Sequence, residues 1–186
     1  MSDPLRMALA NNADGFFRAA AEGAGAAITC APGCSSCCHV DLSVSPIEAD
    51  AIRDALRTLD RAALETAGHA RADDDDRCVM LNDDGRCIVY EERPLVCRTQ
   101  GLALLYPTGF VPADAVRAKS DRGDVTWCPL NYETDTPAAA HILDAGRLDH
   151  ALAVANRAFT EARGEDPLTR HPLKALLHEA LRELEP

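Results

Sequence analysis

The N-terminal part of the chain carries apolar residues at helical spacing. An Ala-rich segment that includes Phe16 and Phe17 predicts a helix over residues 4–28. Glycine has a low helix propensity, and Gly23 and Gly25 lie near the end of this segment. We therefore expect the helix to fray at these two glycines.

A second helix is predicted after residue 45. In the run Ser45-Pro46-Ile47-Glu48 the serine provides an N-cap, the proline suits the first turn, and the glutamate completes a capping box. The apolar positions that follow keep helical spacing: Ile52, Ala55, Leu56, Leu59 and Ala63. The pattern indicates one helix that continues to Gly68.

The C-terminal part, residues 136–185, predicts two further helices. Thr136-Pro137 begins a long helix that ends at Gly164. Its apolar face consists of Ala145, Leu148, Leu152, Ala155, Phe159 and Ala162. The last helix is expected from about Pro172 to Leu184.

The middle of the chain has a different pattern. Residues 78–90 place the turn sequence Asn82-Asp83-Asp84-Gly85 between two short apolar runs, which predicts a β-hairpin with Gly85 at a positive φ. The two arms of this hairpin would let Cys78 and Cys87 face one another. A turn or short helix after Arg93-Pro94 then carries Cys97, and residues 100–135 are expected to be irregular around Cys128.

These elements predict a mainly α fold with a small β-hairpin. Residues 1–186 would form a single compact domain, with helices packed around a cysteine-rich loop and the hairpin. Composition agrees, because hydrophobic residues make up 47% of the chain and aromatic residues only 4%. The formal net charge of -11 disfavours nucleic acid and anionic membranes as partners.

The chain contains eight cysteines, which are its candidate functional residues. They are Cys30, Cys34, Cys37, Cys38, Cys78, Cys87, Cys97 and Cys128. The chain shows no signal peptide and no apolar run approaching about 18 residues, so we expect a cytoplasmic protein whose thiols stay reduced. Four thiols within nine residues, in that compartment, indicate metal ligation ahead of redox exchange or disulfides.

The cysteine spacing resembles a known family. The motif comprises Cys30-x3-Cys34-x2-Cys37-Cys38, then Cys78 followed by Asp84-Gly85-Arg86-Cys87-Ile88-x-Tyr90, then Arg93-Pro94-x2-Cys97-Arg98, and finally Cys128. It is similar to the YkgJ-like cysteine-cluster family of zinc- or iron-chelating domains. The resemblance covers about residues 30–128, includes all eight cysteines, and implies a metal-chelating role without a defined reaction.

Thiolates suit zinc, iron–sulfur clusters and Cu(I), so the ligand type leaves the metal open between a [4Fe–4S]-type cluster and Zn²⁺. One closed zinc needs four thiolates, and the surplus favours iron–sulfur. Adjacent side chains diverge in regular structure. Cys37 and Cys38 therefore bind one ion through a bent backbone, or two ions of a polynuclear site. We expect Cys34, Cys37, Cys38 and Cys97 to share one centre.

Several neighbouring residues have two interpretations. His39 is either a ligand or an exposed loop histidine, and Cys128 is either a ligand or a small buried apolar residue beside Trp127. Arg93 and Arg98 either offset thiolate charge or pair with surface carboxylates.

No self-contained catalytic site is evident in the sequence. The spacing Cys30-x3-Cys34-x2-Cys37 equals that of radical S-adenosylmethionine enzymes, but the alternation of strands and helices in their barrel is missing. Cys34-x2-Cys37 lacks the thioredoxin βαβ context. The alternative function is an iron–sulfur oxidoreductase or electron-transfer component that acts with a redox or client protein partner.

Overall fold

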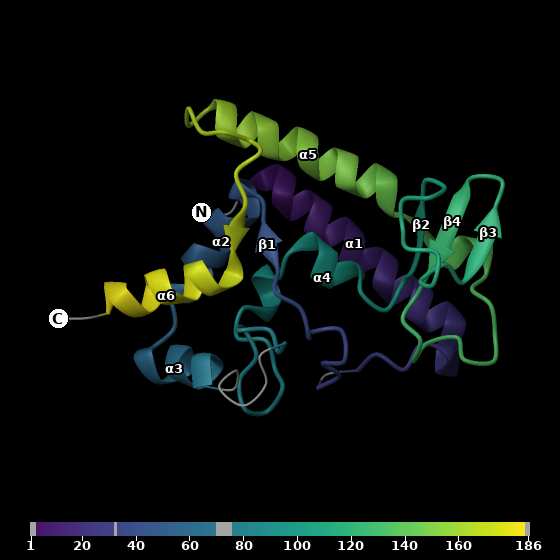
Figure 1. Cartoon of the computed structure of the whole chain (residues 1–186), viewed down its shortest axis with the longest axis horizontal. Helices are drawn as coiled ribbons and strands as arrows, with labels where there is room; N and C mark the ends of the chain where they lie inside the picture. Colours follow the sequence, from purple (N-terminus) through teal and green to yellow (C-terminus); the bar gives the residue numbers. More distant parts are fainter. Residues whose placement is uncertain (1–2, 32, 70–75, 185–186) are drawn as a thin grey trace. The chain divides into compact units, whose positions relative to one another are not determined.

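The computed structural model describes residues 3–31, 33–69 and 76–184 (Figure 1). Residue contacts divide the chain into two compact units. Unit 1 comprises Met1–Arg6, Ala31–Pro94 and Ala155–Pro186, and unit 2 comprises Met7–Cys30 and Leu95–Val154. The units are therefore interleaved along the sequence. That residues 1–186 form a single domain stays a prediction.

Unit 1 is built on helices that share one apolar core. Its elements are β1 (Ser43–Val44), α2 (Pro46–Leu56), α3 (Arg61–His69), the 3-10 turn η2 (Tyr90–Glu92), β6 (His171–Pro172) and α6 (Leu173–Glu183). β1 and β6 pair antiparallel, with Val44 opposite His171. Ile52, Leu56 and Leu176 are almost fully buried in the core, and each contributes about 1.5–3 kcal/mol through burial.

The predicted start of α2 is confirmed, but its predicted length is wrong. The Ser45 N–H donates to Glu48 Oε2 at 3.2 Å, as the capping box requires. The helix ends at Leu56, and α3 begins at Arg61. Asp60 starts this new helix, because its Oδ1 accepts from the Ala63 N–H at 2.9 Å. A helix-like spacing of apolar residues therefore continues across a break in the backbone.

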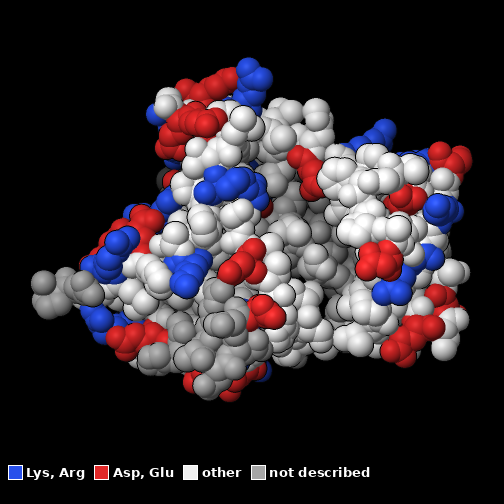
Figure 2. Space-filling view, in the orientation of Figure 1, with Lys and Arg blue, Asp and Glu red and all other residues white. Residues whose placement is uncertain are grey.

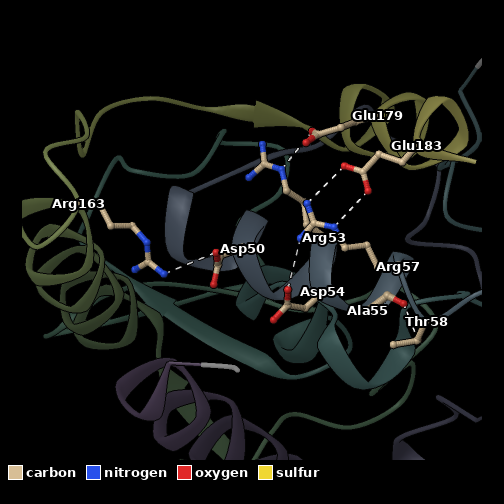
Figure 3. A network of polar contacts seen from close by, with 9 residues as sticks. All are labelled: Asp50, Arg53, Asp54, Ala55, Arg57, Thr58, Arg163, Glu179 and Glu183. Carbon is tan, nitrogen blue, oxygen red and sulfur yellow. Dashed lines mark hydrogen bonds and ion pairs between the residues drawn. The ribbon is translucent and has the colours of Figure 1, made fainter.

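Ion pairs connect α2 to α6 on the solvent side of this core (Figure 3). Arg53 Nε lies 3.1 Å from Glu179 Oε2, and Arg57 Nε lies 3.2 Å from Glu183 Oε2. Figure 2 shows acidic and basic side chains interspersed over the viewed face. Such exposed pairs each contribute little, so the apolar face holds α6 against α2.

Unit 2 contains a small sheet that the sequence pattern did not predict. Its elements, some of which cross the unit boundary, are α1 (Pro4–Ala24), η1 (Gly25–Ala27), α4 (Leu95–Thr99), β2 (Ala103–Tyr106), β3 (Ala118–Ser120), β4 (Gly123–Thr126), η3 (Ala139–His141), β5 (Ile142–Asp144) and α5 (Ala145–Glu161). The strand order is β3-β4-β2-β5, with β2 and β5 parallel.

This sheet corrects two expectations. Residues 100–135 are not irregular throughout, because β2, β3 and β4 form an antiparallel ladder within them. The long C-terminal helix begins at Ala145 rather than Thr136, because residues 142–144 pair with β2. Asp144 Oδ1 then accepts from the Arg147 N–H at 3.1 Å and caps the helix.

The other predicted helices are confirmed. α1 ends at Ala24 and continues as η1, which agrees with the expected fraying at Gly23 and Gly25. α6 spans Leu173–Glu183, close to the predicted bounds. The fold is mainly α with a small β component, as expected. None of the helices in the described part of the chain combines the length and hydropathy needed to cross a bilayer.

Candidate metal centre

The cysteine-rich loop of unit 1 folds as two consecutive turns. The Cys34 N–H donates to Ala31 O at 2.9 Å, and the Cys38 N–H donates to Ser35 O at 2.8 Å. Gly33 has a φ of 96°, which only glycine adopts without strain. Cys34 and Cys37 are exposed, and Cys38 is half-buried. The turns provide the bent backbone that adjacent thiol ligands need.

A tight turn carries Cys78 and Cys87. The Asn82 N–H donates to Arg86 O at 2.9 Å, and the Asn82 Oδ1 accepts from the Arg86 N–H at 2.9 Å. Gly85 has a φ of 73°, which confirms its predicted conformation. The predicted hairpin is present only as one bridge, between Leu81 and Cys87. Both thiols pack against the core of unit 1.

One backbone hydrogen bond joins the loop to the turn. The Cys78 N–H donates to Cys38 O at 2.7 Å. A Cβ on Gly85 would lie 3.6 Å from Ser35 Oγ, so the tip of the turn also approaches the loop. The segments that carry Cys34, Cys37, Cys38, Cys78 and Cys87 are thereby held together within unit 1.

Two of these thiols have pKa values that are shifted in opposite directions. The pKa of Cys37 is lowered to about 6, chiefly because the Cys38 thiol hydrogen-bonds to it. Its own backbone N–H and the charge of His39 act in the same direction, against the effect of burial. Burial raises the pKa of Cys87 to about 11, and Cys78 raises it further, against the Val89 backbone and Arg93. Cys37 is therefore poised as a thiolate at neutral pH, whereas Cys87 keeps its proton.

Unit 2 contains Cys30, Cys97 and Cys128, and Asn131 connects two of them. The Asn131 side chain is 1% exposed. Its Nδ2 donates to Cys30 Sγ at 3.3 Å and to Gly101 O at 2.6 Å, while its backbone N–H donates to Cys128 O at 2.9 Å. A single buried amide thus fixes the position of Cys30 relative to the Cys128 backbone.

Gly101 makes room for the Cys30 sulfur. A Cβ at this position would lie only 2.6 Å from Cys30 Sγ, which is closer than van der Waals contact allows. The φ of Gly101 is also 93°, in the region that favours glycine. The turn between α4 and β2 therefore requires a glycine on both counts.

The structure gives the two arginines near Cys97 different partners. Arg98 is buried and donates to Asp14 Oδ2 at 2.5 Å, so it pairs with a carboxylate. This pair fixes α4, the short helix that carries Cys97. Arg93 lies over the Tyr90 ring at 4.0 Å, and its charge also lowers the pKa of Cys87.

All eight cysteines lie in the described part of the chain, and each carries an unbridged thiol. Among the described residues, no three His, Cys, Asp or Glu side chains converge in a metal-holding arrangement. The donor set itself fits zinc or an iron–sulfur cluster, because every candidate ligand is a thiol. The assignment of the eight as ligands, and the grouping of Cys34, Cys37 and Cys38 with Cys97, stay predictions.

Sequence reasoning missed Asn131, whose only local signal is its place three residues after Cys128. Its contact with Cys30 spans 101 positions, which no local pattern reports. Asn82 was identified as a turn residue, but not as the acceptor for two backbone N–H groups, those of Asp84 and Arg86.

Comparison with known proteins gives one match. Residues 29–129 match the model of a family named CxxCxxCC, described as "Putative zinc- or iron-chelating domain". The matched segment covers more than half of the chain and includes all eight cysteines. Searches of curated proteins and of solved structures found no match.

Proposed function

Because the chain belongs to the CxxCxxCC family of zinc- or iron-chelating domains, we propose that its eight cysteines hold a metal centre. The centre is of the [4Fe–4S] type or contains Zn²⁺, and iron–sulfur is favoured because eight thiolates exceed what one closed zinc needs. The protein acts in the cytoplasm, in keeping with eight unbridged thiols. Its partner is the metal ion, and it has no catalytic site of its own.

The hydrogen bond from Cys78 to Cys38 is the observation that carries this proposal. It joins two cysteine-bearing segments that are 40 positions apart, at 2.7 Å. Nothing in ordinary loop packing requires cysteines on both segments. A soft metal ion does require it, because it needs several thiolates from different directions.

Purification without oxygen, followed by iron, sulfide and zinc analysis and a visible spectrum, tests the metal. We expect brown protein with broad visible absorption that air bleaches, because iron–sulfur clusters absorb light and react with oxygen. Zinc has a filled d shell and gives no colour. Colourless protein with stoichiometric zinc and no iron, from cells supplied with both metals, would overturn the iron–sulfur choice.

Cys37→Ser tests the ligand assignment. We expect a sharp loss of bound metal and a lower melting temperature, because metal affinity adds to folding free energy in such sites. Ser36→Ala, in the same loop, is the matched control and should keep both. Full metal content and an unchanged melting temperature in Cys37→Ser would show that this thiol is not a ligand.

A second candidate function is electron transfer with a redox partner protein. The amide N–H of Asn131 that points at Cys30 Sγ favours it, because hydrogen bonds to cluster sulfurs tune reduction potentials. When bound, an iron–sulfur cluster would supply one-electron chemistry at this place. A reversible one-electron titration of the anaerobic protein tests this role, and protein without any redox signal would exclude it.

A further inference from the structure

The helix that carries Cys97 is too short to be stable alone. α4 spans Leu95–Thr99, little more than one turn, and isolated helices of this length are not stable in water. Its position must therefore come from contacts with the rest of unit 2. Leu95 supplies one such contact, because it is 6% exposed in the apolar core of that unit. Apolar burial is non-directional, so this contact alone does not fix the direction of the Cys97 thiol.

Arg98, the residue after Cys97, supplies a directional contact. Its side chain is 4% exposed, and its Nη1 donates to Asp14 Oδ2 at 2.5 Å. The arginines of the ion pairs between α2 and α6 are 26% and 51% exposed, so the Asp14–Arg98 pair is far more deeply buried. A guanidinium holds its donors in one plane, so its bond to a carboxylate sets an orientation as well as a distance.

Stability alone does not explain a buried ion pair. Replacing both partners with apolar residues of similar volume is often neutral or stabilising, because taking two charges out of water is costly. Removing one partner is harmful, because the other charge then stays buried without compensation. A geometric requirement is the better explanation for the Asp14–Arg98 pair. Cys97, directly adjacent to Arg98, is the residue that has such a requirement.

Asp14 lies on a helix that is itself firmly packed. It belongs to the middle of α1, and its neighbour Ala13 is 0% exposed. Ala20, further along the same helix, is 1% exposed, and both alanines belong to the apolar core of unit 2. A side chain on a packed helix is held more precisely than one on a loop, so Asp14 provides Arg98 with a fixed anchor.

The chain after α4 has a second fixed point at Gly101. Gly101 O accepts from Asn131 Nδ2 at 2.6 Å, and the same Nδ2 donates to Cys30 Sγ at 3.3 Å. Cys97 therefore lies in a segment of unit 2 that is held at Arg98 and again at Gly101. Another candidate ligand, Cys30, is held at the second of these points.

We propose that Asp14 and Arg98 are positioning residues for Cys97 in the metal centre, an inference that rests on the proposed function. The pair holds the thiol in the direction that the centre requires, so less conformational freedom is lost when the metal binds. The Arg98 guanidinium faces Asp14, which balances its charge. The pair therefore acts through the position of Cys97 and not by neutralising thiolates.

The probe for this role is Zn²⁺, titrated into the reduced, metal-free full chain in competition with a chelator of known affinity. Asp14→Asn and Arg98→Gln each leave the partner charge uncompensated, and each should weaken Zn²⁺ binding about tenfold or more. Arg98→Lys keeps the charge without the planar donors and should recover only part of the loss. If Arg98 neutralised thiolates directly, Asp14→Asn would leave the Zn²⁺ affinity unchanged, and that result would overturn the proposal.

Cys97→Ser separates positioning from other effects of the pair. Seven of the eight thiols remain, more than one zinc needs, so this variant still binds Zn²⁺. Adding Asp14→Asn to it should leave the remaining affinity unchanged, because the thiol through which the pair acts is gone. A further tenfold loss in the double variant would show that Asp14 acts elsewhere and would also overturn the proposal.

Leu148→Ala is the matched control for stability. Leu148 belongs to α5 and is 8% exposed in the apolar core of unit 2, so the variant leaves a cavity and lowers the melting temperature. At temperatures where it stays folded, its Zn²⁺ affinity should equal that of the parent protein. Equal losses of affinity in Leu148→Ala and Asp14→Asn would mean a purely structural role and overturn the proposal. A parent protein that does not bind Zn²⁺ would instead contradict the metal-binding function itself.

Discussion

At the scale of single residues, the buried Asn131 side chain connects Cys30 with two backbone segments of unit 2. Its Oδ1 accepts from the Thr29 N–H at 2.9 Å, and its Nδ2 donates to Cys30 Sγ and Gly101 O. All of this takes place at a buried position, where an unmade hydrogen bond is costly. Both the oxygen and the nitrogen of the Asn131 amide therefore contribute to stability.

Asn131→Asp should destabilise the protein by about 2–3 kcal/mol, because it keeps the acceptor but replaces both donors with an oxygen that faces Gly101 O. Thermal and urea unfolding measure the loss. Asn82→Asp is the matched control, since Asn82 uses its Oδ1 to accept from two backbone N–H groups. Equal stabilities of the two variants would contradict this account of Asn131.

Gly85→Ala should cost about 1 kcal/mol, because the φ of 73° places any Cβ in the disfavoured left-handed region. Backbone strain, rather than a clash, is the cause, since the added methyl would only come into van der Waals contact with Ser35 Oγ, at 3.6 Å. Gly15→Ala within α1 is the control and should stabilise by about 0.5–1 kcal/mol. The free energies of unfolding of both variants test this prediction. A stability change of the same sign in the two variants would contradict it.

At the scale of elements, helix starts and turns can be predicted from neighbouring residues. The pairing of strands that lie far apart in the sequence cannot. Ser45, Pro46 and Glu48 predicted the start of α2, and the turn at Gly85 was predicted from four adjacent residues. The sheet of unit 2 was missed, because β2 pairs in parallel with β5, almost 40 positions later. Such short strands contain too few residues to show an alternating pattern.

The candidate metal centre was also predictable only in part. The eight cysteines could be identified because their spacing is local and dense. The contact of Cys30 with Asn131 and the bond between Cys38 and Cys78 depend on tertiary structure, which single segments do not encode. Helical periodicity also continued across the break at Asp60, because apolar residues on both sides face one core.

The junction of β6 with α2 gives the protein a pH dependence. Burial lowers the pKa of His171, and Arg53 and Arg170 lower it further, against Glu165 and Glu179. The unfolded chain therefore takes up this proton first as the pH falls below about 6.5, so this contribution to stability is full above that pH and is lost below it.

His171→Gln should make the melting temperature fall less steeply between about pH 7 and pH 5.5 than in the parent protein. His178→Gln, at an exposed position of α6, is the control and should keep the parent slope. Titration of the cysteines is common to all three proteins and cancels in the comparison. A parent-like slope in His171→Gln would assign the pH dependence to other groups.

At the scale of the whole molecule, two kinds of interaction stabilise unit 1. The core between α2, α3 and α6 is apolar, whereas the cysteine loop is held by a few backbone hydrogen bonds. A bound metal would add to the interactions that hold the cysteine loop, and not to those between α2, α3 and α6. The two regions should therefore respond differently when metal is removed.

Chelation of the metal should lower the melting temperature and raise hydrogen exchange in residues 33–44 and 76–90, while α2 and α6 stay protected. Exchange followed by mass spectrometry, before and after chelation, measures both regions in one sample. Protection lost equally from α2 and α6 would mean that the metal supports the whole core, and protection retained everywhere would mean that it supports none of it.

The interleaved order of the units has a consequence for biosynthesis. Leu173, Leu176 and Leu177 of α6 complete the core that α2 begins, more than 100 residues earlier in translation. During synthesis, Leu64, Met80 and Val89 become available to the apolar side of α2 first, and the part of this core that α6 covers stays incomplete until α6 has emerged from the ribosome. The nascent cysteine loop is present throughout this interval, and chaperones and metal-loading factors would encounter it before unit 1 can close.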